Sequence, residues 1–142
     1  AAVTDFLDQA RHNPQALVCG YPIYDQTVPL ARLWCRELTN FWVHVNTRSK
    51  ALKDAMCGFR VYPIAQTLPV LPSVRTRRMD FDPDIAVRLL WAGVPVINRP
   101  VRVTYPKDGI SHFRGFSDNM RISRLHAGHF CTMLLRRMGL AK

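Results

Sequence analysis

Two stretches decide the fold: KDAMCGFRVYP at residues 53–63 and MDFDPDIAVRLLWAGVPVINRPVRVTYP at residues 79–106. The first places an aspartate, a small Cys-Gly step and an arginine on one short segment. The second places three alternate aspartates before an apolar segment of helical period. Acid and cation together favour a phosphorylated ligand, because a planar guanidinium holds phosphate oxygens in pairs.

The second stretch predicts a helix and then an extended strand. Asp82 followed by Pro83 is typical of a helix N-terminus, and the apolar residues that follow keep helical spacing. The run VPVINRPVRVTY, residues 94–105, predicts an extended or edge strand, because Pro95 and Pro100 cannot donate ladder hydrogen bonds.

Outside this region the same patterns predict further helices and strands. Residues 4–12 predict a short helix, 16–24 a buried strand, and 29–45 an amphipathic helix of about four turns. Residues 58–64 predict a strand, and 117–138 a basic helix. Helices that alternate with strands predict a layered α/β fold.

Size and cysteine content indicate one soluble domain. A chain of 142 residues with 48% hydrophobic composition can bury one core. It has no apolar run long enough to span a membrane and no signal-peptide pattern at its start, so we expect a cytoplasmic protein. The four cysteines have no CxxC spacing, which favours free thiols over disulfides or a zinc knuckle.

The formal charge of +10 favours anionic partners, which include nucleic acid, phospholipid headgroups and sugar nucleotides. No RNP pattern, zinc finger or clear helix-turn-helix occurs, so we do not expect a nucleic-acid partner. The final helix carries Arg121, Arg124, Arg136 and Arg137 beside apolar side chains. Such a helix can rest on an anionic membrane surface, which allows a peripheral location on the inner face of the membrane.

Asp80, Asp82 and Asp84 allow two interpretations. In the first, Asp82 is the N-cap of the helix, and Asp84 complements the helix dipole in the first turn. In the second, Asp82 also acts as a general base, which accepts a proton from an acceptor hydroxyl as that hydroxyl attacks a sugar carbon. The two roles are compatible, because a helix N-terminus favours the ionised carboxylate.

Over nearly all of residues 5–115, the chain resembles inverting family 2 glycosyltransferases of the GT-A fold, especially the branch of dolichol-phosphate-mannose-synthase-like enzymes. DAMCGFRVYP, residues 54–63, is similar to the Asp-x-x-Ser-Gly-Phe-Arg segment of that family. Cys57 stands at the serine position and thereby joins the implied substrate-binding residues. FDPDIAVRLLWAG, residues 81–93, resembles the Glu-Asp segment that opens the acceptor-side helix, with Phe81 in place of the glutamate.

The resemblance implies a partial GT-A (nucleotide-diphospho-sugar transferase) fold, an α/β fold with a mixed sheet flanked by helices. The nucleotide-binding half, whose Asp-x-Asp would hold most of a divalent Mg or Mn cation, would lie upstream of residue 1. Residues 1–116 would form the acceptor-side half, and residues 117–142 a basic amphipathic C-terminal helix. The complete enzyme would transfer a sugar with inversion from a nucleotide-sugar donor to a hydroxyl or lipid-phosphate acceptor, whereas this chain alone would be inactive.

On this resemblance Asp82 is the catalytic base, with Asp80 as the fallback. Asp54 and Arg60 would line the substrate crevice, and Gly58 would let backbone and ligand approach closely. Two simpler roles stay open from the residues themselves. Asp54 can be a turn-capping carboxylate, and Arg60 can form a surface salt bridge.

The sequence signals around three histidines are less specific than those around the aspartates. His112, in the glycine-bearing segment KDGISHFRG, can supply a late metal ligand or touch the diphosphate, or it can be a solvated loop histidine. Arg114 beside it can pair with phosphate as a further substrate-binding residue. His126 and His129 form an HxxH, which without further ligands at zinc spacing favours buried or interfacial histidines.

A noncatalytic function remains the alternative, namely an anion-binding or membrane-surface interaction module. The absence of half of a parallel sheet would also expose an apolar strand edge. Such an edge favours a homodimer of this chain.

Overall fold

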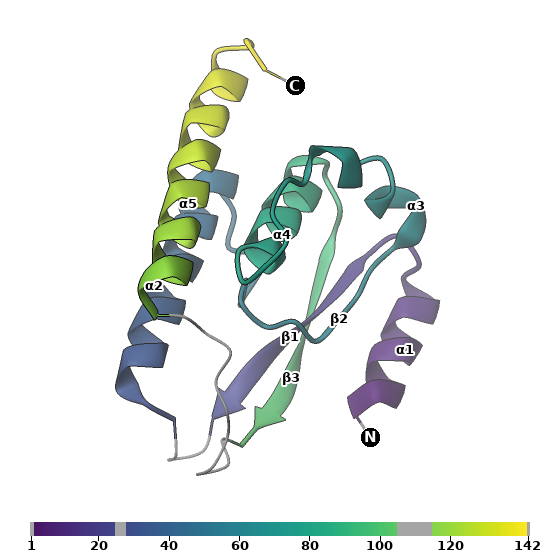
Figure 1. The fold of residues 1–142 in the computed structure, drawn as a ribbon. Helices are drawn as coiled ribbons and strands as arrows, with labels where there is room; N and C mark the ends of the chain where they lie inside the picture. Colours follow the sequence, from purple (N-terminus) through teal and green to yellow (C-terminus); the bar gives the residue numbers. More distant parts are fainter. Residues whose placement is uncertain (1, 25–27, 105–114, 142) are drawn as a thin grey trace.

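The computed structural model describes residues 2–24, 28–104 and 115–141, which form an α/β fold with a small mixed sheet flanked by helices (Figure 1). The elements in chain order are α1 (Ala2–His12), β1 (Leu17–Tyr24), α2 (Leu30–Thr47), β2 (Arg60–Val61), α3 (Ile64–Thr67), the 3-10 turn η1 (Leu71–Ser73), α4 (Phe81–Trp91), β3 (Val96–Val103) and α5 (Gly115–Arg137).

The described sheet has three strands in the order β2-β1-β3. β1 pairs with β2 in antiparallel and with β3 in parallel orientation, from Leu17 opposite Val96 to Tyr24 opposite Val103. β3 therefore lies at one edge of the described sheet, as its prolines predict, since Pro100 has no N–H to donate to a second neighbour.

The strand predicted over residues 58–64 is wrong except for Arg60 and Val61. Pro63 ends the extended segment, because it is the residue from which α3 starts. Before Arg60, the backbone bonds to side chains instead of to a neighbouring strand. Asp54 accepts the Cys57 N–H, and Arg60 donates to the Cys57 carbonyl, so the chain turns there and the ladder does not continue.

β1 is the buried centre of the fold, as its apolar run predicts. Leu17 and Cys19 belong to a core cluster with apolar side chains of α2 and α4. Val18 between them is also buried and, because side chains alternate along a strand, points to the opposite face. α1 packs near the sheet through Phe6. The Phe6 and Phe59 rings meet edge to face, with their centroids 4.6 Å apart.

A glycine in β1 permits the close approach of β3 and of the segment before β2. A methyl group on Gly20 would lie 2.9 Å from Val101 Cγ2 and 3.0 Å from the Phe59 carbonyl oxygen. It would also lie 3.1 Å from Cys57 Sγ. The Gly20 N–H donates to that same Phe59 oxygen at 2.8 Å, so the backbone cannot move away without losing this bond.

α5 packs against α2 and α4 through polar side chains that are almost fully buried. His129 bonds to Asp84 of α4 at 2.9 Å, and the Asn46 side-chain amide of α2 donates to the His126 carbonyl at 3.3 Å. The Trp91 indole N–H of α4 donates to the Asn46 carbonyl at 3.0 Å. Both histidines of the HxxH are thus buried side chains, as predicted.

His126 is the less satisfied of the two. Its side chain is 4% exposed, and neither ring nitrogen has a hydrogen-bond partner in the part of the chain that the structure describes. Burial, with a smaller contribution from nearby His129, lowers the pKa of His126 to about 4. The imidazole is therefore neutral at pH 7.

We expect Gly20→Ala to lower the free energy of unfolding by about 1–3 kcal/mol, because the added methyl group overpacks the sheet. Urea denaturation followed by circular dichroism measures the change. Gly128→Ala is the matched control: a methyl group there meets nothing within 4 Å on helix α5, so it should leave stability unchanged or raise it by about 0.5–1 kcal/mol. Equal destabilisation by both variants would contradict the close approach at Gly20.

We expect stability to fall as the pH decreases from about 6.5 to about 4. In this window an unfolded His126 takes up a proton while the folded one stays neutral, so the folded state loses up to about 3 kcal/mol. Urea denaturation at a series of pH values should show a shallower decline for His126→Leu than for the original chain. Parallel profiles would show that His126 does not titrate differently on folding.

Candidate active site

Arg60 ties the 54–60 segment to the start of α4. Its Nε donates to the Cys57 carbonyl at 2.8 Å and its Nη2 to the Ala55 carbonyl at 2.7 Å. Its Nη1 donates to the Asp82 carbonyl at 2.8 Å. The Arg60 side chain is fully buried, so the prediction of a surface salt bridge is wrong. The guanidinium donates to carbonyls of the buried residues Ala55 and Cys57 and links them to the first turn of α4 through the Asp82 carbonyl.

Asp54 fixes the other end of the same segment. It is 3% exposed, and its Oδ1 accepts the backbone N–H groups of Met56 and Cys57 at 2.8 and 2.7 Å. Arg36 of α2 contacts both carboxylate oxygens at 2.7 Å. Asp54 therefore caps the turn, and it also joins this turn to α2.

α4 begins earlier than the sequence predicts. The residue before its first turn is Asp80, so Asp82 lies inside the helix, and the prediction that Asp82 is the N-cap is wrong. A turn closed by the Phe81 N–H and the Arg78 carbonyl at 2.9 Å leads directly into the helix. Pro83 fits in the first turn, because the leading N–H groups of a helix have no intrahelical partner.

The Asp82 carboxylate lies beside Gly58 and Arg60. Its Oδ1 is 3.9 Å from Arg60 Nη1, and a methyl group on Gly58 would lie 3.5 Å from its Oδ2. Within residues 2–24, 28–104 and 115–141, its oxygens accept no hydrogen bond, and the side chain is 33% exposed. Burial raises the pKa of Asp82, and Arg60 opposes this rise. The site thus presents an accessible carboxylate that is more basic than an ordinary aspartate.

The neighbouring thiols and phenol are less suited to chemistry at neutral pH. Cys57 and Cys19 are buried, and burial raises the pKa of Cys19 to about 11. Burial also raises the pKa of Tyr62. Cys19 and Tyr62 therefore stay protonated at neutral pH, which leaves Asp82 as the basic group with an open side.

The other two aspartates are engaged. Asp80 Oδ1 accepts the Arg78 N–H at 3.2 Å. Asp84 is 1% exposed and accepts from Thr76 at 2.8 Å and from Arg88 Nε at 2.6 Å, besides its bond to His129. Burial opposes its ionisation, yet the hydrogen bonds of His129, Arg88 and Thr76 keep the pKa of Asp84 below its usual value.

Sequence reasoning missed the role of Asp84. The available signal was its i, i+4 spacing to Arg88 on a helix, which predicts an ion pair. The partners from outside α4 leave no local sequence signal. They belong to a segment before the helix and to α5, 45 residues later.

Two predicted residues, His112 and Arg114, lie outside the described residues. For the part of the chain that is described, no three His, Cys, Asp or Glu side chains gather in a way that could hold a metal ion.

The chain is similar to dolichyl-phosphate beta-glucosyltransferase of Dictyostelium discoideum, with 21% identity over 127 residues. The matched region covers 86% of this chain and 38% of that enzyme, so the chain spans well under half of its relative. No family model and no solved structure matches the chain. This distant similarity supports a relationship to family 2 glycosyltransferases.

We expect Arg60→Met to lower the free energy of unfolding by at least about 2 kcal/mol, because the carbonyls of the buried residues Ala55 and Cys57 lose this donor and the link to the Asp82 carbonyl of α4 is lost. Urea denaturation measures the loss. Arg75→Met, which removes an exposed guanidinium, is the control and should change stability by no more than about 0.5 kcal/mol. A loss at Arg60 as small as that at Arg75 would show that the three hydrogen bonds do not hold the segment to α4.

Proposed function

We propose that this chain is the acceptor-side half of an inverting, family 2-like glycosyltransferase. The parent enzyme transfers a sugar from a nucleotide-sugar donor to a hydroxyl or lipid-phosphate acceptor. The observation that carries the proposal is the environment of Asp82, whose partly exposed carboxylate lies next to Gly58 and accepts no hydrogen bond from the described residues. The distant glycosyltransferase relative supports the same reaction class.

In this proposal Asp82 is the general base. Its oxygens are not consumed by hydrogen bonds to the described protein, and its raised pKa strengthens it as a proton acceptor. An acceptor hydroxyl that approaches over Gly58 reaches Oδ2 without meeting a side chain from that residue. As the oxygen attacks the anomeric carbon from the face opposite the leaving diphosphate, its proton passes to Asp82.

The rate gain from a general base depends on the class of acceptor. A hydroxyl must lose its proton during the attack, whereas a phosphate monoester is already largely ionised at pH 7. A base that the structure holds accessible and partly desolvated is therefore of most use to a hydroxyl acceptor, and we propose this class for Asp82.

Arg60 is a positioning residue in this proposal and does not bind donor phosphate. Each of its nitrogens already donates to a backbone carbonyl, and the side chain has no exposed surface. By holding the Asp82 carbonyl, Arg60 fixes the first turn of α4 and with it the direction of the Asp82 carboxylate. We assign the Mg or Mn cation to the nucleotide-binding half, since the described residues of this chain do not fit it.

We expect Asp82→Asn to lower kcat by about 10²–10⁴-fold, the range for loss of a general base. The test joins the chain to its upstream nucleotide-binding half, supplies sugar nucleotides with Mn or Mg and a hydroxyl acceptor, and measures release of the nucleoside diphosphate. Asp80→Asn is the matched control and should keep its rate within a few-fold.

Two outcomes would contradict different parts of the proposal. Equal rates for the original chain and Asp82→Asn remove Asp82 from the mechanism. No diphosphate release with any donor, from a joined protein that is folded by circular dichroism, argues against the glycosyltransferase reaction itself.

A further inference from the structure

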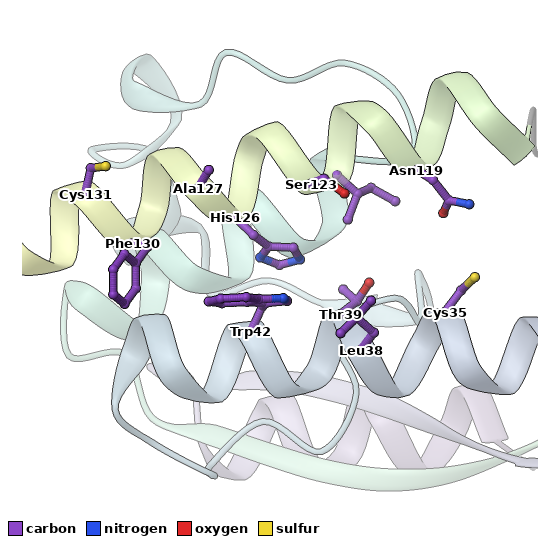
Figure 2. Close-up of a pocket in the computed structure, with 11 residues that line it drawn as sticks. Cys35, Leu38, Thr39, Trp42, Asn119, Ser123, His126, Ala127, Phe130 and Cys131 are labelled. Atoms are coloured by element: carbon purple, nitrogen blue, oxygen red, sulfur yellow. The ribbon is translucent and has the colours of Figure 1, made fainter.

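α2 and α5 run side by side in the same direction along one flank of the molecule (Figure 1). Between them lies a groove of about 680 Å³, lined mainly by apolar side chains. Figure 2 shows Trp42 and Leu38 of α2 facing His126 and Phe130 of α5 across it. The groove extends over several helical turns, from Cys35 and neighbouring residues to Phe130 and Cys131, and is therefore elongated.

Large apolar side chains continue from this groove onto the open surface of both helices. On α2 they follow helical spacing at Leu30, Trp34, Leu38 and Phe41, and Trp34 is 77% exposed. The corresponding exposed residues of α5 are Phe116, Met120, Phe130 and Leu134, followed by Met138 just after the helix, and Phe116 is 83% exposed. Together with the groove they form one surface, here called the α2–α5 face. Such a continuous apolar surface marks an interaction site.

Basic side chains border this face on α5. Arg124 is exposed one turn after Met120, and Arg137 is exposed three residues after Leu134. The two arginines lie on opposite flanks of the apolar stripe, because at 3.6 residues per turn their separation in sequence places them roughly 140° apart around the helix. The chain as a whole carries a formal charge of +10. Glu37 is an exposed acidic residue of α2 near the face.

The groove also contains a polar group without a partner. His126 is buried, its ring lies over the ring of Trp42 in Figure 2, and among the described residues neither ring nitrogen is hydrogen-bonded. A neutral imidazole offers one donor and one acceptor. Both ring nitrogens are buried, so the groove presents mainly hydrocarbon to its occupant, as the acyl chains of a phospholipid require.

We propose that the α2–α5 face docks on an anionic phospholipid bilayer, with its aromatic and aliphatic side chains in the acyl boundary and its arginines at the headgroups. Charge selects this occupant over a second copy of the chain. Self-association through the face would bring the basic flanks of two strongly positive molecules together, whereas anionic lipid complements them. None of the helices within the described ranges is long and apolar enough to cross a membrane. The proposed contact places the two helices on the bilayer surface.

Some residues of α5 face the protein and are therefore not available to lipid. Arg136 donates to the Trp91 carbonyl at 3.3 Å and stacks on the Trp91 ring, so it faces the protein. Ile122 is buried. The lipid-facing set therefore consists of the outer side of α5 and the apolar stripe of α2. This proposal does not depend on the proposed glycosyltransferase reaction.

The test is flotation of the full 142-residue chain with vesicles of phosphatidylcholine alone or mixed with phosphatidylglycerol. We expect binding to the mixed vesicles that weakens with added salt. Trp34→Ser with Phe116→Ser should reduce binding by at least about tenfold, since each removes a large apolar anchor. Arg124→Gln with Arg137→Gln should reduce it by about tenfold on anionic vesicles only.

Matched controls remove equivalent side chains from other parts of the surface. Ile64→Ser with Leu68→Ser takes exposed apolar residues from α3 and its end, and Arg11→Gln with Arg102→Gln takes the same charge from α1 and β3. Both should bind vesicles like the original chain. No binding to the mixed vesicles overturns the proposal, as does an equal loss in face and control variants. A dimer in light scattering that Trp34→Ser with Phe116→Ser abolishes, without vesicle binding, would assign the face to a second copy.

Discussion

The buried guanidinium of Arg60 is the constraint on which the candidate site depends. A charged side chain without exposed surface is tolerated only when hydrogen bonds replace its water. Arg60 obtains them from the carbonyls of Ala55, Cys57 and Asp82, which come from two segments far apart in the chain. The same three bonds that make its burial tolerable therefore also set the position of the Asp82 carboxylate.

Three aspartates at alternate positions have three different roles because their surroundings differ. Asp84 is enclosed by Thr76, Arg88 and His129 and connects α4 to α5. Asp80 bonds to a nearby backbone N–H before the helix. Partial burial raises the pKa of Asp82, yet its side chain is 33% exposed and its oxygens accept no hydrogen bond from the described residues. Identical residue types with regular spacing thus give one structural, one local and one chemically available carboxylate.

The candidate site and the α2–α5 face lie on different parts of the molecule. The candidate site lies where the 54–60 segment meets the first turn of α4, and its neighbours are polar or small. The α2–α5 face lies on the flank formed by the two long helices and is apolar with basic borders (Figure 1). In our proposals one carries the chemistry and the other holds the molecule at a lipid surface, and each can fail without the other.

The sequence by itself determined the local elements. Apolar periodicity predicted α1, α2, α4 and α5, the apolar run of β1 predicted a buried strand, and prolines predicted β3 as an edge. These features depend on neighbours in the chain, so sequence patterns report them. Sequence predicted β2 as too long a strand, and it did not predict the start of α4 at Phe81 or the burial of Arg60. Those depend on hydrogen bonds between side chains and backbone groups from separate segments, and only the tertiary structure brings such partners together.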